Sequence, residues 1–241
     1  MDLVEGVIPQ PVTHEDNSDL ISIPLSSEIK EVIFSLKSEI SPGPDGFRNF
    51  FFQSFWDILD VDVCRLVIHF FKDGILPHGL NDQFLALIPK VENANKIHLF
   101  RTVALVNTIY KIMCKTHANR LSSITSKIVS ANQFGFIKGS SIQDCLITAS
   151  ECVNLLKSPI RGGNIASKLD VRKAFDTMDW VFIRKILTMF CFDNTFINWV
   201  KIILGSAHIS VLINGSPEGY FGCSRGVKQG DPLSAVIFFH C

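Results

Sequence analysis

Helix-type and strand-type apolar patterns alternate along these 241 residues, but not in a regular strand–helix–strand order. Apolar residues recur at helical spacing within residues 27–39 and 107–128, which predicts amphipathic helices. Residues 84–90 and 100–106 are short apolar runs and predict strands. The segment SPGPDG at 41–46 interrupts any helix, because it contains two prolines and two glycines. Without a repeated βαβ unit, the pattern predicts an α+β fold.

The other segments are predicted in the same way, and residues 1–24 read as an N-terminal tail or linker. We expect further helices at residues 47–72 (one or two helices, ended by Asp73-Gly74), 142–157, 173–190 and 194–204. A strand is expected at 164–171. A hairpin is expected at 209–223, with its reversal at Pro217-Glu218-Gly219. A last helix is expected from Asp231-Pro232.

Charge is divided unevenly along the chain, although the formal net charge is zero. Residues 1–62 hold twelve acidic and three basic side chains, whereas residues 93–143 hold seven basic side chains and no acidic one. A stretch with positive charge only is a candidate surface for a polyanion. The alternative is a helix face that pairs with the acidic N-terminal part, and charge alone does not separate the two.

Neither a membrane segment nor a secretory signal is expected. The longest apolar runs, such as residues 235–240, are too short to span a bilayer. The N-terminus has no basic segment followed by an apolar one. The seven cysteines include no CxxC pair, which favours reduced thiols over a zinc site or a disulfide framework. These features predict an intracellular protein of the cytoplasm or nucleus.

Residues 167–176, SKLDVRKAFD, form a segment that we call motif A. Asp170 ends the predicted strand, where a carboxylate can bind a divalent metal ion, because magnesium takes oxygen ligands. Taken alone, an Asp between a strand and a helix is more often a helix N-cap. Taken alone, Phe175 is more often a core residue.

Residues 225–234, RGVKQGDPLS, form a second segment, motif B. Gly226 and Gly230 permit a close backbone approach to a ligand. Gln229 offers both a donor and an acceptor to a base pair. Two cations of motif B either contact phosphate or are plain surface charges, namely Arg225 and Lys228.

Both motifs resemble those of reverse transcriptases, most closely the plant-type, LINE-like enzymes of non-LTR retrotransposons. Motif A matches the family pattern Lys-Leu-Asp, two variable residues and Lys-Ala-aromatic-Asp at every fixed position. Further family landmarks are matched by LIPK at 87–90, LFRTVALVNTIYKIMCK at 99–115, SPGPDGF at 41–47 and QFGFIKGSSIQD at 133–144. The resemblance extends from about residue 24 to residue 240.

The resemblance implies that residues 25–241 are the fingers and an incomplete palm of a right-hand polymerase. The implied activity is RNA-directed DNA synthesis with an RNA template, a DNA primer, dNTPs and two Mg²⁺ ions. Asp170 would bind both ions, helped by the backbone carbonyl of Val171. The implied nucleotide-binding residues are Lys90, Arg101, Phe175 (as a steric gate against the ribose 2′-hydroxyl), Gln229 and Gly230. Contacts with nucleic acid are expected from Lys111, Lys115, Arg120, Arg225 and Lys228.

The family's aromatic-Ala-Asp-Asp motif, which carries the remaining catalytic carboxylates, is not among the 241 residues. A two-metal site needs these carboxylates, so we expect no primer extension by this chain alone. The alternative function is a non-catalytic nucleic-acid-binding module that uses the basic residues 93–143.

Overall fold

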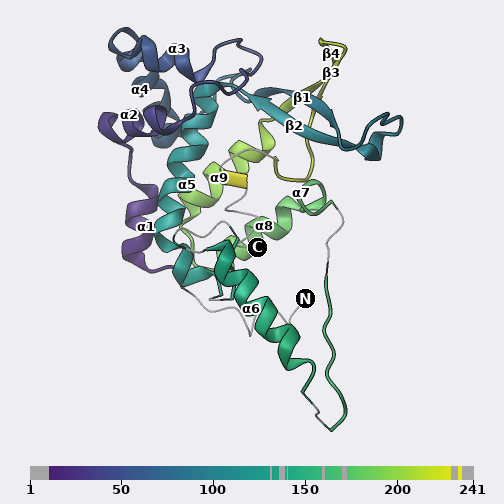
Figure 1. The fold of residues 1–241 in the computed structure, drawn as a ribbon. Coiled ribbons are helices and arrows are strands. Elements are labelled where there is room, and N and C mark those ends of the chain that lie inside the picture. Colours follow the sequence, from purple (N-terminus) through teal and green to yellow (C-terminus); the bar gives the residue numbers. More distant parts are fainter. Residues whose placement is uncertain are drawn as a thin grey trace.

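The computed structural model describes residues 11–130, 132–135, 139, 141–158, 161–169, 173–228 and 233–234. In these residues the chain forms helices and a four-stranded sheet, and the sheet lies at one end of the helical part (Figure 1). This mixture of helices and mainly antiparallel strands confirms the predicted α+β class. Among the described helices, none is long and apolar enough to cross a membrane.

The sheet has the strand order β2-β1-β3-β4. β1 (Asp82–Pro89) pairs antiparallel with β2 (Phe100–Val106), and a short 3₁₀ helix, η1 (Ile97–Leu99), lies between them. β3 (His208–Ile213) lies parallel to β1 and forms a hairpin with β4 (Ser216–Gly222). Parallel pairing needs a long crossover connection, which the helices between β2 and β3 provide.

The β3–β4 hairpin reverses at Asn214-Gly215, and the predicted reversal at residues 217–219 is wrong. Both turn residues have positive φ, 51° and 84°, and Asn-Gly is the preferred pair for a two-residue hairpin turn of this kind. Pro217 instead pairs with Leu212 within the ladder. The proline is tolerated because β4 is an edge strand.

The described residues form α1 (His14–Ile21), α2 (Ser26–Ser35), α3 (Asn49–Ser54), α4 (Trp56–Asp73), α5 (Thr108–Ile128), α6 (Ile142–Leu155), α7 (Ala174–Thr177), α8 (Trp180–Met189) and α9 (Asn194–Gly205). α4 ends at Gly74, which takes the left-handed conformation expected of a C-terminal glycine. The helix predicted at 173–190 is divided in two. Asp179 caps α8 by accepting a hydrogen bond from the amide of Val181 at 2.7 Å.

α5 lies at the centre of the core and packs against α1, α2 and α4. A buried ring cluster connects α4, α5 and α9, and consists of Phe70, Phe71, His117, Phe196 and Trp199. Large aromatic side chains remove much apolar surface from water, so this cluster is a main source of the stability of the fold.

Residues 14–21 form α1, so the expectation of a tail or linker over residues 1–24 is wrong for this part. Thr13 and Asp16 form a capping box at its start. Leu20 is buried, and Asp16 accepts a hydrogen bond from Lys127 of α5 at 2.6 Å. So short a helix is stabilised by such tertiary contacts rather than by its own periodicity, which is why the sequence pattern missed it.

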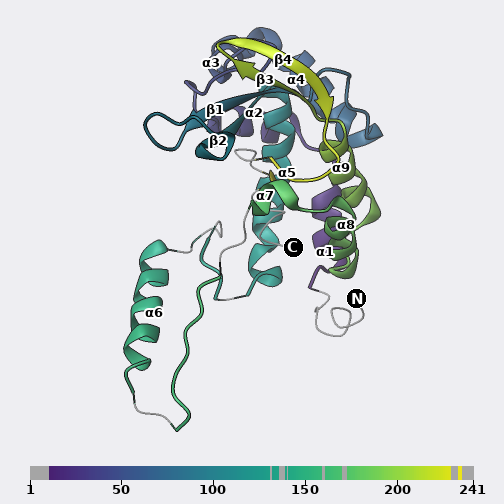
Figure 2. The same ribbon diagram turned by 90° about the vertical axis from the view of Figure 1, so that its right-hand side faces the viewer.

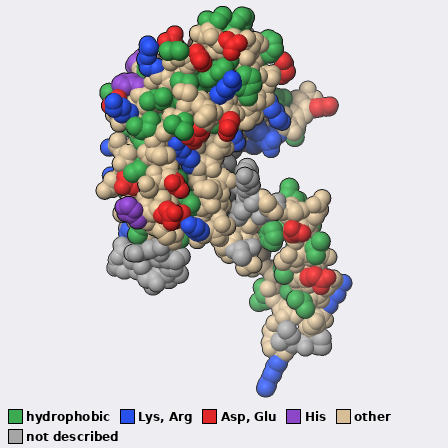
Figure 3. Space-filling view, turned by 90° about the vertical axis from the view of Figure 1, so that its left-hand side faces the viewer, with side chains coloured by type: hydrophobic (Ala, Val, Ile, Leu, Met, Phe, Trp, Pro, Cys, Tyr) green, Lys and Arg blue, Asp and Glu red, His purple; other side chains and the backbone are tan. Residues whose placement is uncertain are grey.

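α6 stands apart from the other helices, as Figures 1 and 2 both show. None of the residues of α6 is buried, and hydrophobic side chains lie on the surface of this projecting part of the molecule (Figure 3). Residues 161–169 run back beside α6 without joining the described sheet. The strand expected at 164–171 is therefore not formed in its described part, 164–169. The helix expected from Asp231-Pro232 lies outside the described residues, apart from residues 233–234.

Candidate functional site

The end of motif A and the residues that follow it lie beside motif B and are joined to it by hydrogen bonds. The amide of Gly226 donates to the carbonyl of Met178 at 2.7 Å, and the amide of Val227 donates to the carbonyl of Phe175 at 2.8 Å. The indole N–H of Trp180 donates to the carbonyl of Gly226 at 2.7 Å. Two segments that are far apart in the sequence therefore form one local unit.

Gly226 is the point of closest approach between the two motifs. Its φ is +84°, in the region that favours glycine. A Cβ atom at this position would lie 2.9 Å from the carbonyl oxygen of Asp176 and 3.1 Å from that of Phe175. Because both obstacles are backbone atoms, no side-chain movement relieves the contact. The predicted close approach was to a ligand and stays a prediction, whereas the close approach in this structure is to the backbone of motif A.

The described part of motif A forms a tight turn at the start of α7. Lys173 has a φ of 54°, and its carbonyl accepts hydrogen bonds from the amides of Asp176 and Thr177 at 2.9 and 3.1 Å. Phe175 is half-buried and packs against the core. A position at the edge of the core is compatible with both interpretations of this ring, as a core residue and as a steric gate.

The predicted metal ligands Asp170 and Val171 lie outside the described residues, as do Gln229 and Gly230. Within the described ranges, no group of three or more His, Cys, Asp or Glu side chains could hold a metal ion. The described donors therefore do not supply a metal site. The roles of Asp170 and Val171 remain predictions.

Lys90 and Arg101 are exposed at the end of the β1–β2 ladder that is remote from α5. Arg101 is paired with Ile88. The amide of Lys90 donates to the carbonyl of Leu99 at 2.8 Å, which continues the ladder by one residue. Because side chains alternate along a strand, Lys90 and Arg101 fall on the same face of the hairpin. The register places Lys90 two residues beyond Ile88, the residue that pairs with Arg101.

Arg120 of α5 is committed to contacts within the chain. It forms a two-pronged ion pair with Glu28, with N···O distances of 2.9 and 2.8 Å, and its side chain is only 12% exposed. The same guanidinium donates to the carbonyls of Leu20 and Ser22. The guanidinium fork that would bind phosphate thus holds α1 and α2 against α5 in this structure. The role of Arg120 as a nucleic-acid contact remains a prediction.

The other basic residues of α5 differ in their surroundings. Lys111 is buried and donates to the carbonyl of Ser41 at 3.3 Å. Burial lowers its pKa, and the nearby Asp45 carboxylate opposes this effect. Lys111 therefore contacts the Pro/Gly-rich loop in this structure, and its role as a nucleic-acid contact remains a prediction. Lys115 is half-buried, while Lys127 pairs with Asp16.

Pairing between α5 and the acidic N-terminal part was the alternative interpretation of the basic stretch. The ion pairs of Arg120 with Glu28 and of Lys127 with Asp16 confirm this alternative for two of the seven cations. The sequence could not separate the two interpretations, because it does not show which faces of α2 and α5 meet.

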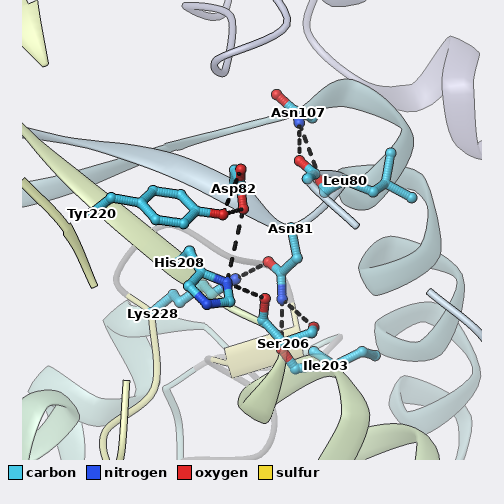
Figure 4. A network of polar contacts seen from close by, with 10 residues as sticks. Leu80, Asn81, Asp82, Asn107, Ile203, Ser206, His208, Tyr220 and Lys228 are labelled. Atoms are coloured by element: carbon cyan, nitrogen blue, oxygen red, sulfur yellow. Dashed lines mark hydrogen bonds and ion pairs between the residues drawn. The ribbon is translucent and has the colours of Figure 1, made fainter. Parts of the chain in front are cut away.

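The two cations of motif B point in different directions. Arg225 is exposed. The ammonium group of Lys228 instead donates to Asn81 Oδ1 and to the hydroxyl of Tyr110, and lies 4.1 Å from the centroid of the Tyr110 ring. Figure 4 shows Lys228 reaching Asn81 beside β3. Its ammonium group is thus engaged within the chain in this structure, and the role of Lys228 as a phosphate contact remains a prediction.

Sequence reasoning missed three residues that shape this site, namely Trp180, Asn81 and Tyr110. Asn81 is buried and donates to the carbonyl of Ile203 and to the hydroxyl of Ser206, both at 2.8 Å (Figure 4). No local pattern marks Asn81, because its partners come from α9 and motif B. Tyr110 and Trp180 do carry a signal, since they are two of only five Tyr and Trp residues in the chain.

Comparisons with known proteins agree with the motifs. The family model of reverse transcriptase (RNA-dependent DNA polymerase) matches residues 88–241. The uncharacterized 149 kDa protein of transposon TX1 from Xenopus laevis is 31% identical over 95% of this chain. The Pol polyprotein of the retrotransposable element R2DM from Drosophila melanogaster is 27% identical over 82% of the chain, and that of an R2 element from Nasonia vitripennis is 25% identical over 89%.

This chain spans only 17%, 18% and 20% of the lengths of these three proteins. The match nevertheless covers more than half of the chain, including both motifs and Lys90 and Arg101. The relatives confirm the resemblance to enzymes of non-LTR retrotransposons. The chain belongs to the reverse transcriptase family.

Proposed function

We propose that these residues are the fingers and part of the palm of an RNA-directed DNA polymerase from a non-LTR retrotransposon. The observation that carries the proposal is the main-chain pairing of Gly226 and Val227 of motif B with residues 175–178, which include the end of motif A. This pairing brings the segment that precedes Gln229 next to the segment that follows Asp170. A polymerase needs this neighbourhood, because the incoming nucleotide must touch both a metal-binding carboxylate and the template base pair.

The individual roles follow from the chemistry of each side chain. Asp170, with the carbonyl of Val171, would hold divalent metal ions, which reverse transcriptases generally use and which we propose to be Mg²⁺. These ions would stabilise the charge that develops on the phosphates. Lys90 and Arg101 would grip the triphosphate, Phe175 would exclude the ribose 2′-hydroxyl, and Gln229-Gly230 would lie against the new base pair. Arg225 and Lys115 remain candidates for contact with the RNA template or the DNA primer.

Binding of an RNA–DNA primer–template hybrid tests this proposal directly. The chain is titrated with the fluorescently labelled hybrid and Mg²⁺, with either the complementary dNTP or a non-complementary one. We expect the complementary dNTP, but not the non-complementary one, to increase the affinity of the chain for the hybrid. The Asp170→Ala variant should show no such increase. Equal affinities with both nucleotides would overturn the proposal.

Primer extension tests the separate expectation that the 241 residues do not catalyse by themselves. They contain no aromatic-Ala-Asp-Asp sequence, so we expect no incorporation of labelled dNTP. Magnesium-dependent incorporation that disappears in Asp170→Ala would contradict this expectation.

A non-catalytic nucleic-acid-binding module based on residues 93–143 is less favoured. Arg120, Lys111 and Lys127 engage partners within the chain, so these three cations of the described part are not freely presented to a polyanion. A strong salt dependence of RNA binding that falls when Lys111 is neutralised would restore this alternative.

A further inference from the structure

The neighbouring helices α8 and α9 form an apolar groove between them (Figures 1 and 2). Each helix contributes one face, because its lining residues recur at positions i, i+3, i+4 and i+7. The lining consists of Trp180, Val181, Ile183, Arg184 and Leu187 from α8, and of Ile197, Val200, Lys201 and Leu204 from α9. The groove thus follows two helix faces and is built entirely from described residues.

The groove has a buried floor and an exposed rim. Ile183, Leu187 and Val200 are only 1%, 2% and 2% exposed, because they also belong to the core. Val181, in the first turn of α8, is 62% exposed. The packing of the core therefore fixes the floor, while the rim offers uncovered apolar surface to an occupant.

The charged side chains of the groove are both cationic, and each helix supplies one. Arg184 and Lys201 are exposed, and neither has an ion-pair partner among the described residues. The lining itself contains no carboxylate. An occupant with negative charges beside an apolar centre is complementary to this arrangement.

The volume of the groove indicates the size of the group that enters it. The groove measures about 180 Å³, close to the ~150 Å³ cavity that holds a benzene-sized group. Sites for whole small molecules usually have about 300–1,000 Å³. One or two apolar side chains of a protein therefore fit the groove better than a cofactor does. An amphipathic helix inserts such side chains at i, i+3 or i+4, and i+7.

We infer that the groove between α8 and α9 docks an acidic amphipathic helix of a partner protein. Apolar side chains of the partner lie on the floor, and its carboxylates face Arg184 and Lys201. The inference does not depend on the proposed polymerase function, because it uses no residue assigned to metal, nucleotide or nucleic acid. Apolar burial supplies most of the affinity in such an interface, and the charges select the partner.

A synthetic peptide provides the probe. It is fluorescently labelled, rich in Ala and about 20 residues long, because much shorter peptides are marginally helical. Leu residues at helical spacing form one stripe, and Glu residues flank the stripe on both sides. A control peptide has the same composition in scrambled order. In fluorescence anisotropy, we expect the chain to bind the ordered peptide at least about tenfold more tightly. Equal binding of both peptides would overturn the inference.

Reversal of the rim charges tests the electrostatic part of the inference. Arg184→Glu with Lys201→Glu should weaken binding of the ordered peptide about tenfold at low salt. Lys30→Glu, at an exposed cation of α2 outside the groove, should leave it unchanged. A peptide with Lys in place of Glu should bind the doubly reversed variant more tightly than it binds the parent chain. Without this recovery, the charges of the groove do not select the peptide, and the inference fails.

Val181→Asp tests the apolar part of the inference. The exposed position and the place in the first turn of α8 both make an Asp compatible with folding. Because a charge enters the apolar rim, we expect the ordered peptide to bind at least about threefold more weakly. Unchanged binding would show that the peptide lies elsewhere on the chain, and would overturn the inference.

Two measurements distinguish the partner helix from other occupants of the groove. Self-association of the parent chain in sedimentation velocity that disappears in the doubly reversed variant would identify a second copy as the occupant. Displacement of the peptide by an RNA–DNA hybrid would assign the two cations to nucleic acid. Either result would overturn the inference, and neither depends on whether the chain responds to a nucleotide.

Discussion

Gly226 and Gly215 have the same φ, +84°, but different surroundings. No atom lies within 4 Å of a Cβ built on Gly215, whereas a Cβ on Gly226 meets two backbone carbonyls of motif A. We expect Gly215→Ala to cost about 1–2 kcal/mol of unfolding free energy, which is the strain of the left-handed conformation. Gly226→Ala should cost at least about 1 kcal/mol more, because the backbones must also move apart. Urea denaturation of both variants measures the difference, and equal losses would show that the motifs are not in contact there.

Arg120 and Arg48 provide a second matched pair at the scale of single residues. Arg120 pairs with Glu28 through side chains that are 12% and 33% exposed, while the 3.7 Å pair of Arg48 with Glu39 has side chains that are 58% and 81% exposed. We expect Arg120→Met to lower the unfolding free energy by about 2 kcal/mol, because Glu28 and two carbonyls lose their donor. Arg48→Met should cost less than about 1 kcal/mol. If Arg120→Met leaves stability unchanged but weakens RNA binding, Arg120 is the predicted nucleic-acid contact and does not stabilise the fold.

At the scale of elements, α6 contributes no buried residue to the described fold. Leu146 and Ile147 are 64% and 62% exposed, so Leu146→Gln with Ile147→Gln should change the unfolding free energy by less than about 1 kcal/mol. The same change at Leu187 of α8, which is 2% exposed, should cost several times more. Exposed apolar side chains favour self-association, and sedimentation velocity should show less of it in the double variant. A large loss of stability would mean that α6 is buried against the chain in solution.

Elements with local determinants could be predicted from the sequence, and those with distant determinants could not. Gly74 ends α4, and the apolar runs of β1 and β2 form the expected strands, because these signals act within a few residues. α1 was missed because Lys127, more than a hundred residues away, helps to hold it. The hairpin reversal was misplaced because both Asn214-Gly215 and Pro217-Glu218-Gly219 are turn sequences, and only the pairing register selects one.

At the scale of the whole molecule, the sequence predicted which segments form the site but not how they are held. Motif A and motif B were found by resemblance, and the structure joins them through Gly226 and Val227. The direction of the Lys228 side chain was not predictable, because its partners Asn81 and Tyr110 lie more than a hundred residues away in the sequence. Spacing along the chain identifies reactive residue types, whereas the direction of a long cation depends on the packing of the whole core.

His117, in the buried ring cluster of α4, α5 and α9, makes the stability of the whole fold depend on pH. Its side chain is 0% exposed, and neither ring nitrogen has a hydrogen-bond partner among the described residues. Burial, followed by the charge of Arg120, lowers the pKa of His117 from 6.5 to about 3. Between these two values the unfolded chain binds a proton that the folded chain does not, so stability falls as the pH falls from 6.5 to about 3.

Each pH unit below the unfolded pKa costs about 1.4 kcal/mol of unfolding free energy. Because pH 5 lies about 1.5 units below that pKa, the expected loss of stability between pH 7 and pH 5 is about 2 kcal/mol. His117→Leu should remove this part of the pH dependence. It should leave stability at pH 7 similar or higher, because two unpaired buried nitrogens are lost. Asp16 does not interfere, because Lys127 lowers its pKa from 3.8 to about 2 and its stabilisation is lost only below about pH 4. Denaturation curves of the parent and His117→Leu at pH 7 and pH 5 measure the effect. The same slope in both would show that His117 is protonated, or open to water, in the folded chain.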